Sequence, residues 1–325
     1  MMPFDHVNAG SPGEAVDLLT SYGGKGRLIA GGTDVLGILK DRILPDYPDV
    51  LINLKTIPGM DSIKESGEGL NIGALAKLAD IASSPEIKAE YPALSLAAES
   101  VASPEIRTMA TIGGNLCQDV RCWYYRYPHH MGGRMLCFRK GVGPCYAVKG
   151  DNRYHAVMGG KKCFAVCPSD TAIALCALQA KISIFGGEGT RTLPLEKFFT
   201  PMGNVLRSNE LVKEILIPKP TQETRQAFIK FTERKPVDFA VASIACVLEI
   251  LGGRCMDARI YLGGVAPMPW HAEAAERIIK GGSLDDPTAE EAALASVAGA
   301  KPLKGNAYKI EIVKALVKRA LLRRQ

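Results

Sequence analysis

The sequence predicts an α+β fold in two domains. Helix and strand patterns are mixed up to about residue 112, whereas three strand candidates followed by three helix candidates fill residues 227–323. A run of strands and then helices is typical of an α+β domain of about a hundred residues. The polar stretch KPTQETRQ near residue 220 reads as a linker. We therefore expect one domain over residues 1–220 and a second over residues 221–325.

Caps and apolar runs predict the individual elements. Ser11, Pro12 and Glu14 supply a cap, a first-turn proline and an acid three residues after the cap, which predicts a helix ending near Gly23. The other candidates follow from hydrophobic patterning and proline breaks. They are strands at 28–30, 50–54, 70–74, 210–218, 227–231, 243–250 and 258–265, proline-broken helical segments over 81–103, a helix, strand and hairpin turn over 169–190, and helices at 271–280, 288–299 and 307–323.

Composition excludes several classes of function. Hydrophobic residues make up 47% of the 325-residue chain and charged residues 23%, as in a soluble globular protein. The net charge of +6 gathers near the last helix, and no basic face alternates with aromatics, so we expect no nucleic acid partner. No window approaches the roughly 20 apolar residues of a membrane span. The first residues lack a secretory pattern and the nine cysteines fit reduced thiols, so we expect a cytoplasmic protein.

Two glycine turns are candidates for binding an anion. They are AGGTD at 30–34 and TIGGN at 111–115. Adjacent glycines allow positive φ and close approach of backbone amides to phosphate oxygens, and Thr33 and Thr111 add hydroxyl groups. Each motif alone is more often an ordinary turn. Neither matches the Rossmann or the Walker pattern.

Several motifs, taken in order, resemble one family. They are IAGGTDVL, ATIGGNL, PSDTAIALCALQA, ELVKEILIP, FIKF and YLGGVAPMPW. Together they resemble the FAD-binding subunit of the molybdenum hydroxylase family, which includes xanthine dehydrogenase and carbon monoxide dehydrogenase. The resemblance runs from about residue 3 to beyond residue 270. It implies a two-subdomain FAD-binding domain of the vanillyl-alcohol oxidase type, followed by a C-terminal α+β domain of the CO dehydrogenase flavoprotein type.

The resemblance also implies which residues hold FAD. Asp170 matches an acidic residue at the flavin site, Leu211 an apolar residue near the adenine, and Lys230 a lysine close to the flavin. A helix cap, core packing and a solvated strand position are the respective alternatives. The diphosphate and ribitol would be held by Leu28, Ile29, Ala30, Gly31, Gly32, Thr33, Asp34, Thr111, Ile112, Gly113, Gly114 and Asn115.

A cysteine-rich insertion separates the second glycine turn from the PSD motif. In most members of the family these two motifs lie within a few residues of each other, whereas here about fifty residues intervene. Spacing alone leaves a zinc site open, with His129, His130 or His155 as additional ligands, and four thiolates also suit an iron-sulfur cluster. Six of the nine cysteines lie in the segment: Cys117, Cys122, Cys137, Cys145, Cys163 and Cys167.

The start of the insertion is similar to that of one branch of the family. The sequence DVRCWYY at 119–125 resembles the start of the loop that holds a [4Fe-4S] cluster in the β subunit of 4-hydroxybenzoyl-CoA reductase. This similarity implies that the cluster ligands are Cys122, Cys137, Cys145 and Cys163. The interval from Cys145 to Cys163 is longer here, so Cys117 and Cys167 remain candidates for a ligand position.

The resulting functional hypothesis is an electron-transfer subunit. The chain has no convincing acid-base or nucleophile constellation, so we expect no catalytic residue of its own. The resemblance implies FAD, a small [2Fe-2S] subunit, a large molybdopterin subunit that carries the substrate chemistry, and an external carrier such as ferredoxin or NAD(P). Alternatives are an NAD-linked xanthine or aldehyde dehydrogenase-type FAD subunit with a structural insertion, and a zinc-stabilised scaffold protein. Basic residues of the insertion would offset cluster charge or receive an acidic carrier: Arg121, Arg126, Arg134, Arg139, Lys140 and Lys149.

Overall fold

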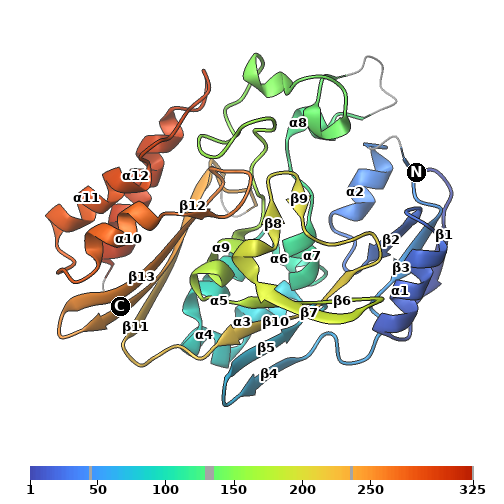
Figure 1. Ribbon diagram of the computed structural model, residues 1–325, viewed down its shortest axis with the longest axis horizontal. Helices are drawn as coiled ribbons and strands as arrows, with labels where there is room; N and C mark the ends of the chain where they lie inside the picture. The colour runs from blue at the N-terminus through green and yellow to red at the C-terminus, as the bar shows by residue number, and fades with distance from the viewer. Residues whose placement is uncertain (44–45, 129–134, 235–236, 324–325) are drawn as a thin grey trace.

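The N-terminal part of the fold is a small parallel sheet with two helices. The computed structural model describes residues 1–43, 46–128, 135–234 and 237–323. The sheet has the order β1-β3-β2 and packs with α1 (Figure 1). Ser11 caps α1 as predicted, because its Oγ accepts a hydrogen bond from Glu14 N at 3.1 Å. The bounds are β1 (Asp5–Asn8), α1 (Pro12–Ser21), β2 (Gly26–Ile29), α2 (Val35–Lys40) and β3 (Val50–Asn53).

A five-stranded antiparallel sheet forms the second part, in the order β4-β5-β10-β6-β7. Proline starts α4, α5 and α6, so the helical region breaks at prolines as predicted. The strands are β4 (Ile63–Ser66), β5 (Gly69–Gly73), β6 (Lys181–Gly186), β7 (Gly189–Pro194) and β10 (Leu211–Pro218), with a small hairpin of β8 (Phe199–Thr200) and β9 (Gly203–Asn204). The helices are α3 (Leu78–Ser83), α4 (Pro85–Glu90), α5 (Pro92–Glu99), α6 (Pro104–Arg107), α7 (Ile112–Cys117), α9 (Asp170–Ala177) and the 3-10 helix η3 (Leu195–Lys197).

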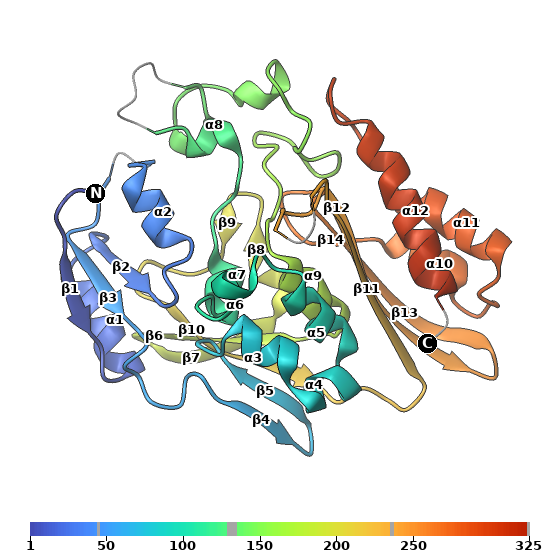
Figure 2. The ribbon, with the colours of Figure 1, turned by 180° about the vertical axis from the view of Figure 1, so that it is seen from behind.

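The C-terminal part is a four-stranded antiparallel sheet covered on both faces. Its own helices lie on the outer face, while α5 and α9 pack against the inner face (Figures 1 and 2). Strand β12 (Ala242–Leu251), one of the two inner strands, is buried over its first seven residues, as expected for a strand with two covered faces. The elements are β11 (Thr224–Phe231), β12 (Ala242–Leu251), β13 (Arg254–Gly263), β14 (Trp270–His271), α10 (Glu273–Ile279), α11 (Asp286–Ser296) and α12 (Tyr308–Leu322).

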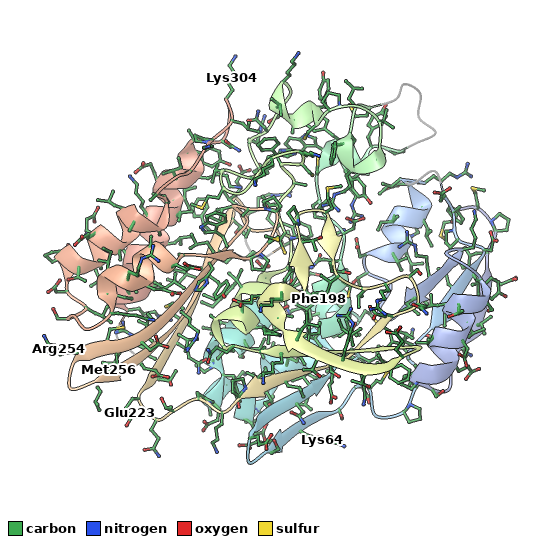
Figure 3. All side chains as sticks on the ribbon, in the orientation of Figure 1. Lys64, Phe198, Glu223, Arg254, Met256 and Lys304 are labelled. Atoms are coloured by element: carbon green, nitrogen blue, oxygen red, sulfur yellow. The ribbon has the colours of Figure 1, made fainter. Side chains whose placement is uncertain are left out.

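The main core lies between these parts. Phe198 is fully buried, and Figure 3 shows it near the centre of the molecule, whereas Lys64, Glu223 and Arg254 project from the periphery. The described helices include no segment that is both long and apolar enough to span a bilayer.

The cysteine-rich insertion lies at one end of the molecule, between α2 and α12 (Figures 1 and 2). It runs from the end of α7 to the start of α9 and contains α8 (Trp123–Arg126) and the 3-10 helices η1 (Phe138–Lys140) and η2 (Tyr146–Val148). Five of its side chains form a small core, separate from the main one, together with Ile43, which lies shortly after α2. The members of this core are Ile43, Val120, Tyr125, Cys137, Cys163 and Ala165. His129, His130 and Arg134 lie outside the described residues.

Candidate functional site

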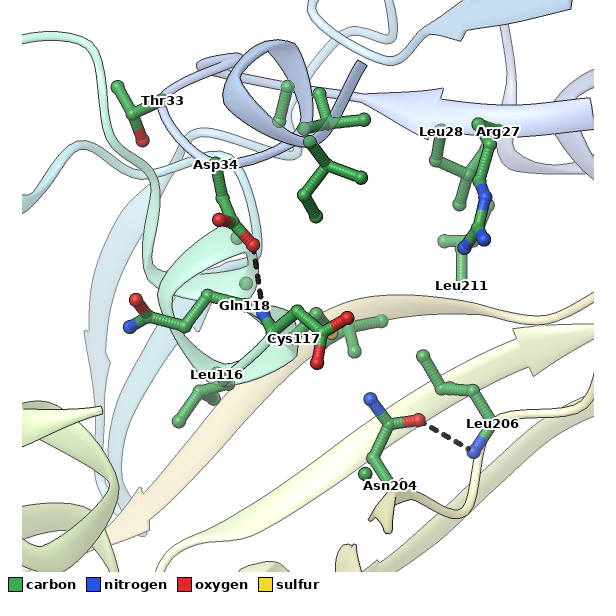
Figure 4. A pocket seen from close by; sticks show the side chains of 18 of the residues that line it. Arg27, Leu28, Thr33, Asp34, Leu116, Cys117, Gln118, Asn204, Leu206 and Leu211 are labelled. Atoms are coloured by element: carbon green, nitrogen blue, oxygen red, sulfur yellow. Dashed lines mark hydrogen bonds between the residues drawn. The ribbon is translucent and has the colours of Figure 1, made fainter. Parts of the chain in front are cut away.

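A cavity of about 690 Å³ opens where the two glycine turns meet (Figure 4). This volume lies in the range of small-molecule and cofactor sites. Apolar side chains of β2 and β10, including Leu28 and Leu211, line one part of the cavity, and the glycine turns line another. Of the predicted site residues, those on the cavity are Leu28, Ala30, Gly31, Gly32, Thr33, Asp34, Thr111, Gly113, Gly114 and Leu211.

Close backbone packing explains why glycine occupies the first turn. A Cβ on Gly31 would lie 2.0 Å from the carbonyl oxygen of Met109, just before the second turn. Gly32 adopts a φ of +74°, which strongly favours glycine. A Cβ on Gly113 would lie 2.9 Å from Ala74 O. At Gly31 the first turn therefore approaches the backbone just before the second turn more closely than a side chain would allow. At Gly113 the second turn approaches the backbone of Ala74 in the same way.

The second turn is the capped start of α7. Thr111 Oγ1 accepts a hydrogen bond from Gly114 N at 3.2 Å, and the amides of Ile112 and Gly113 donate to Ala76 O and Ala74 O, both at 2.9 Å. These amides are thus engaged within the protein rather than forming the anion nest that the motif suggested. The Thr111 hydroxyl still has a proton to donate into the cavity that it lines.

Asp34 joins the first turn to the insertion. Its Oδ1 accepts from Arg126 Nη2 at 2.7 Å and also from Arg121. Its Oδ2 accepts from the backbone amide of Asp119 at 2.8 Å, the hydrogen bond drawn from the Asp34 carboxylate in Figure 4. Burial would raise the pKa of Asp34, but the two arginines outweigh it and hold the pKa below its usual value. The carboxylate is therefore ionised at neutral pH, with its charge balanced by the insertion.

Five predicted residues lie off the cavity: Ile29, Ile112, Asn115, Asp170 and Lys230. Asn115 Oδ1 accepts from Ser169 Oγ at 2.6 Å and from Thr171 Oγ1 at 2.7 Å, and so fixes the start of α9 against α7. Ser169 lines the cavity itself. Asn115 therefore does not line the cavity but holds Ser169, which does, in place.

Asp170 and Lys230 form a buried ion pair behind the cavity. Lys230 Nζ lies 2.7 Å from Asp170 Oδ2 and also donates to Ser100 O at 2.9 Å. The side chains are 5% and 7% exposed, so the alternative of a solvated Lys230 is wrong. Ser169, not Asp170, caps α9 with its side chain. Burial raises the pKa of Asp170, and the ammonium of Lys230 opposes that rise.

Tyr47 and Arg139 are cavity residues that the sequence analysis missed. Among the described residues, the buried Tyr47 Oη and Arg139 Nε have no hydrogen-bond partner, and both side chains line the cavity. Buried polar atoms of this kind need a partner, which a polar cofactor would supply. Tyr47 stands in no motif, so local sequence held no signal for it, whereas Arg139 was expected near the cluster and not at the larger cavity.

A second, narrow cavity contains the four cysteines singled out as cluster ligands. Cys122, Cys137, Cys145 and Cys163 line a narrow space of about 10 Å³, against about 690 Å³ for the larger cavity. Burial raises the pKa of the Cys122 thiol to about 11 and raises that of Cys137. These unligated thiols are therefore protonated at neutral pH.

The other two cysteines of the insertion lie elsewhere. Cys117 and Cys167 line the larger cavity and are absent from the walls of the narrow one. Tyr125 and Arg139 line both cavities, with the Arg139 guanidinium 5.6 Å from the Tyr125 ring centroid. These two side chains therefore separate the two sites.

Of the three histidines considered as additional zinc ligands, His155 lies among the described residues. Its Nε2 lies 3.2 Å from Cys122 Sγ. Burial and the nearby Lys309 lower the pKa of His155 to about 4, so the ring is neutral. Across residues 1–43, 46–128, 135–234 and 237–323, no three or more His, Cys, Asp or Glu side chains are grouped so as to hold a single metal ion.

Two domain families that match the chain place it in the class of flavin-binding oxidoreductase subunits. Residues 2–220 match the FAD binding domain in molybdopterin dehydrogenase, and residues 227–324 match the CO dehydrogenase flavoprotein C-terminal domain. The chain therefore belongs to the family of FAD-binding subunits of the molybdenum hydroxylases. The fold and the family that the sequence motifs predicted are confirmed.

Individual relatives agree with this assignment. The chain is 33% identical over 292 residues to the aldehyde oxidoreductase FAD-binding subunit PaoB of Escherichia coli, covering 87% of this chain and 88% of that protein. It is 30% identical to the carbon monoxide dehydrogenase medium chain of Hydrogenophaga pseudoflava, covering 98% and 96%. A solved structure of that organism's carbon monoxide dehydrogenase superposes with a TM-score of 0.78 at 30% identity, covering 99% of this chain and 97% of the other.

Proposed function

We propose that the chain relays electrons between an external carrier and partner subunits, using FAD in the larger cavity and a [4Fe-4S] cluster in the narrow one. The main support is that four cysteines spread over 42 positions of sequence, Cys122 to Cys163, share one cavity. Of the residues that the structure describes, Tyr125 and Arg139 line both that cavity and the larger one, so the two redox groups would be neighbours.

The larger cavity fits FAD in shape and chemistry. The backbone of Gly31, Gly32 and Gly114 lines the cavity, and Thr33 and Thr111 offer hydroxyl donors to the diphosphate. Leu28 and Leu211 supply apolar surface for the adenine. Bound FAD exchanges one or two electrons. The arginine pair on Asp34 limits repulsion between that carboxylate and the diphosphate.

The four cysteines that line the narrow cavity are the donor set that a [4Fe-4S] cluster takes. Zinc requires its thiolates to converge at about 2.3 Å from one point, and the described side chains show no such group. A [4Fe-4S] cluster also takes four thiolates but holds them farther apart, because the irons and sulfides lie between them. Arg139 and Lys140 lie two and three residues after the proposed ligand Cys137 and would offset the negative charge of a thiolate-ligated cluster.

The position of the insertion suits an external carrier. Phe138 and Tyr146 line the cysteine cavity and are also exposed at the surface, at 36% and 42%. Ferredoxin or NAD(P) would be the carrier, and a small [2Fe-2S] subunit and a large molybdopterin subunit would complete the complex. One solved relative is a Cu,Mo-CO dehydrogenase, which supports a molybdenum-containing partner subunit.

Two substrate classes are supported by different observations. The DVRCWYY motif favours a complex of the 4-hydroxybenzoyl-CoA reductase type, in which electrons run toward molybdenum. The 33% identity to an aldehyde oxidoreductase subunit favours aldehyde oxidation, in which they run away from it. Copurified complex assayed with an aromatic acyl-CoA and with aldehydes would separate the two.

Cofactor content of the anaerobically purified chain tests the proposal. We expect one flavin, about four irons and about four acid-labile sulfides per chain. Cys137→Ser and Cys145→Ser should lose the iron and keep the flavin, whereas Cys167→Ser should keep the iron. Zinc in place of iron, or an iron content unchanged in Cys137→Ser, would overturn the cluster assignment and leave the flavin assignment standing.

A further inference from the structure

His155 is buried directly against one of the four cysteines. It is 3% exposed, and its Nε2 lies 3.2 Å from Cys122 Sγ. Its ring is enclosed by aromatic side chains, with the Trp123 and Tyr124 centroids at 5.8 Å and 5.9 Å. Among the described residues, its Nδ1 has no hydrogen-bond partner. The ring therefore has one specific polar contact, and that contact is a proposed cluster ligand.

We propose that His155 donates a hydrogen bond from Nε2 to the Cys122 thiolate and thereby raises the reduction potential of the cluster. This inference rests on the proposed function, because it needs a cluster at Cys122. His155 is here a positioning and tuning residue that acts through Cys122, and not a fifth ligand.

The chemistry of the pair fixes the direction of the hydrogen bond. A ligated cysteine is a thiolate, which has no proton and can only accept. A neutral imidazole has one N–H and one lone pair, so Nε2 must carry the proton and Nδ1 the lone pair. The second nitrogen of a histidine normally fixes the tautomer, and Nδ1 has no competing acceptor to attract the proton.

The C-terminal domain holds His155 in this place. The His155 carbonyl accepts from Asn306 Nδ2 at 3.0 Å and from Lys309 Nζ at 3.2 Å, and both of these side chains are fully buried. The amide of His155 donates to Asn152 O at 2.9 Å, and Asn152 Oδ1 accepts from Gly305 N at 2.8 Å. These hydrogen bonds fix the backbone of His155, and the Trp123 and Tyr124 rings enclose its imidazole beside Cys122.

A hydrogen bond to a ligand sulfur favours the reduced cluster. Hydrogen bonds to the sulfurs are among the factors that set the potentials of iron-sulfur proteins. One added electron increases the negative charge on the thiolates, so the N–H donor stabilises the reduced state more than the oxidised state. A tenfold change in the ratio of reduced to oxidised cluster at fixed potential corresponds to about 59 mV for one electron.

Two substitutions of His155 distinguish hydrogen bonding from packing. His155→Phe keeps a ring and removes the donor, whereas the side-chain amide of His155→Gln can donate from a similar position. Tyr124→Phe is the matched control, because the Tyr124 hydroxyl donates to Asp151 O at 2.9 Å and not to a cysteine. The full chain is titrated anaerobically with a reductant, and the cluster is followed by electron paramagnetic resonance beside iron and flavin content.

We expect His155→Phe to keep its iron and its flavin and to have a ratio of reduced to oxidised cluster about tenfold lower at the wild-type midpoint, a shift of about −59 mV. His155→Gln and Tyr124→Phe should stay close to wild type. An unchanged midpoint in His155→Phe, or loss of iron from that variant, would overturn the role of His155 while the cluster stands. A wild-type chain without iron would overturn both.

Discussion

Asp34 and Arg126 form an ion pair of 2.7 Å that joins the first glycine turn to the first helix of the insertion. Arg126 Nε also donates to Val120 O at 2.8 Å, and Arg121 Nη2 donates to Gln118 Oε1 at 3.0 Å. The arginines are thus fixed from both ends. Because the same carboxylate lines the larger cavity, the flavin site and the start of the cysteine loop are built as one unit.

Asp34→Asn should therefore weaken both sites. It removes the charge that two largely buried arginines share, and we expect a loss of about 1–3 kcal/mol of unfolding free energy with reduced flavin content. The native pKa of Asp34 is depressed, so its contribution is present above the unfolded value of about 3.9 and is lost as the pH falls through the folded value. The difference in free energy of unfolding between wild type and Asp34→Asn, measured by denaturant unfolding, should decrease below about pH 4.

Glu188→Gln is the matched control for that substitution. Its ion pair with Arg207 is exposed, with the side chains 86% and 60% accessible, and exposed pairs contribute at most about 1 kcal/mol. Equal losses in the two variants would contradict the role assigned to Asp34.

Gly31→Ala should prevent the two turns from meeting. The new Cβ would lie 2.0 Å from Met109 O, so the backbone must move, at a cost of at least about 1–3 kcal/mol. Flavin should be lost as well, since the cavity depends on this approach. Gly37→Ala in α2 meets nothing within 4 Å and should stabilise the chain by about 0.5–1 kcal/mol. Flavin-to-protein ratios and melting temperatures of both variants check this, and a fully flavinated Gly31→Ala would refute it.

The sequence predicted elements whose causes are local. The cap of α1 at Ser11 and the long strands β11 to β13 follow from neighbouring residues, and the structure has them. The short strands β1 and β14 were missed, because two to four residues acquire strand geometry only by pairing with β3 and β13. Their pairing partner, not their own pattern, determines them.

The same distinction holds for the site. The glycine turns were recognisable because glycine itself is the signal. Tyr47, in contrast, reaches the cavity from a loop without a motif, and the Asp170–Lys230 pair joins residues 60 positions apart. Side-chain contacts across such distances depend on how the domains pack, which a single sequence does not encode in any local pattern.

Asp170→Asn should leave the Lys230 ammonium buried without its carboxylate. Breaking a buried pair from one side costs about 3–5 kcal/mol, whereas replacing both partners by apolar residues of similar size is often close to neutral. We therefore expect the double variant Asp170→Leu/Lys230→Met to recover most of the lost stability in denaturant unfolding. A single variant as stable as wild type would contradict the pairing. Flavin loss in the stable double variant would show that the pair also serves the flavin site.

Lys309 should make stability depend on pH above neutrality. It is fully buried, and its ammonium donates to three backbone carbonyls, those of Tyr154 at 3.3 Å, His155 at 3.2 Å and Gly264. Burial lowers its pKa to about 7, against about 10.4 for an unfolded lysine. Between these values the unfolded chain binds more protons than the folded chain, so stability rises with pH.

The free energy of unfolding of the wild type, relative to that of Lys309→Met, should therefore rise with pH. The rise should be up to about 1.4 kcal/mol for each pH unit between about 7 and 10. Denaturant unfolding at pH 7, 8 and 9 measures this gain. Lys318→Met is the control on the same helix, since Lys318 pairs with Asp286 and Glu290 at the surface and its pKa is raised by those bonds, above this pH window. Parallel pH profiles for wild type and Lys309→Met would show that the ammonium stays charged in the folded chain, held by the three carbonyls in spite of its burial.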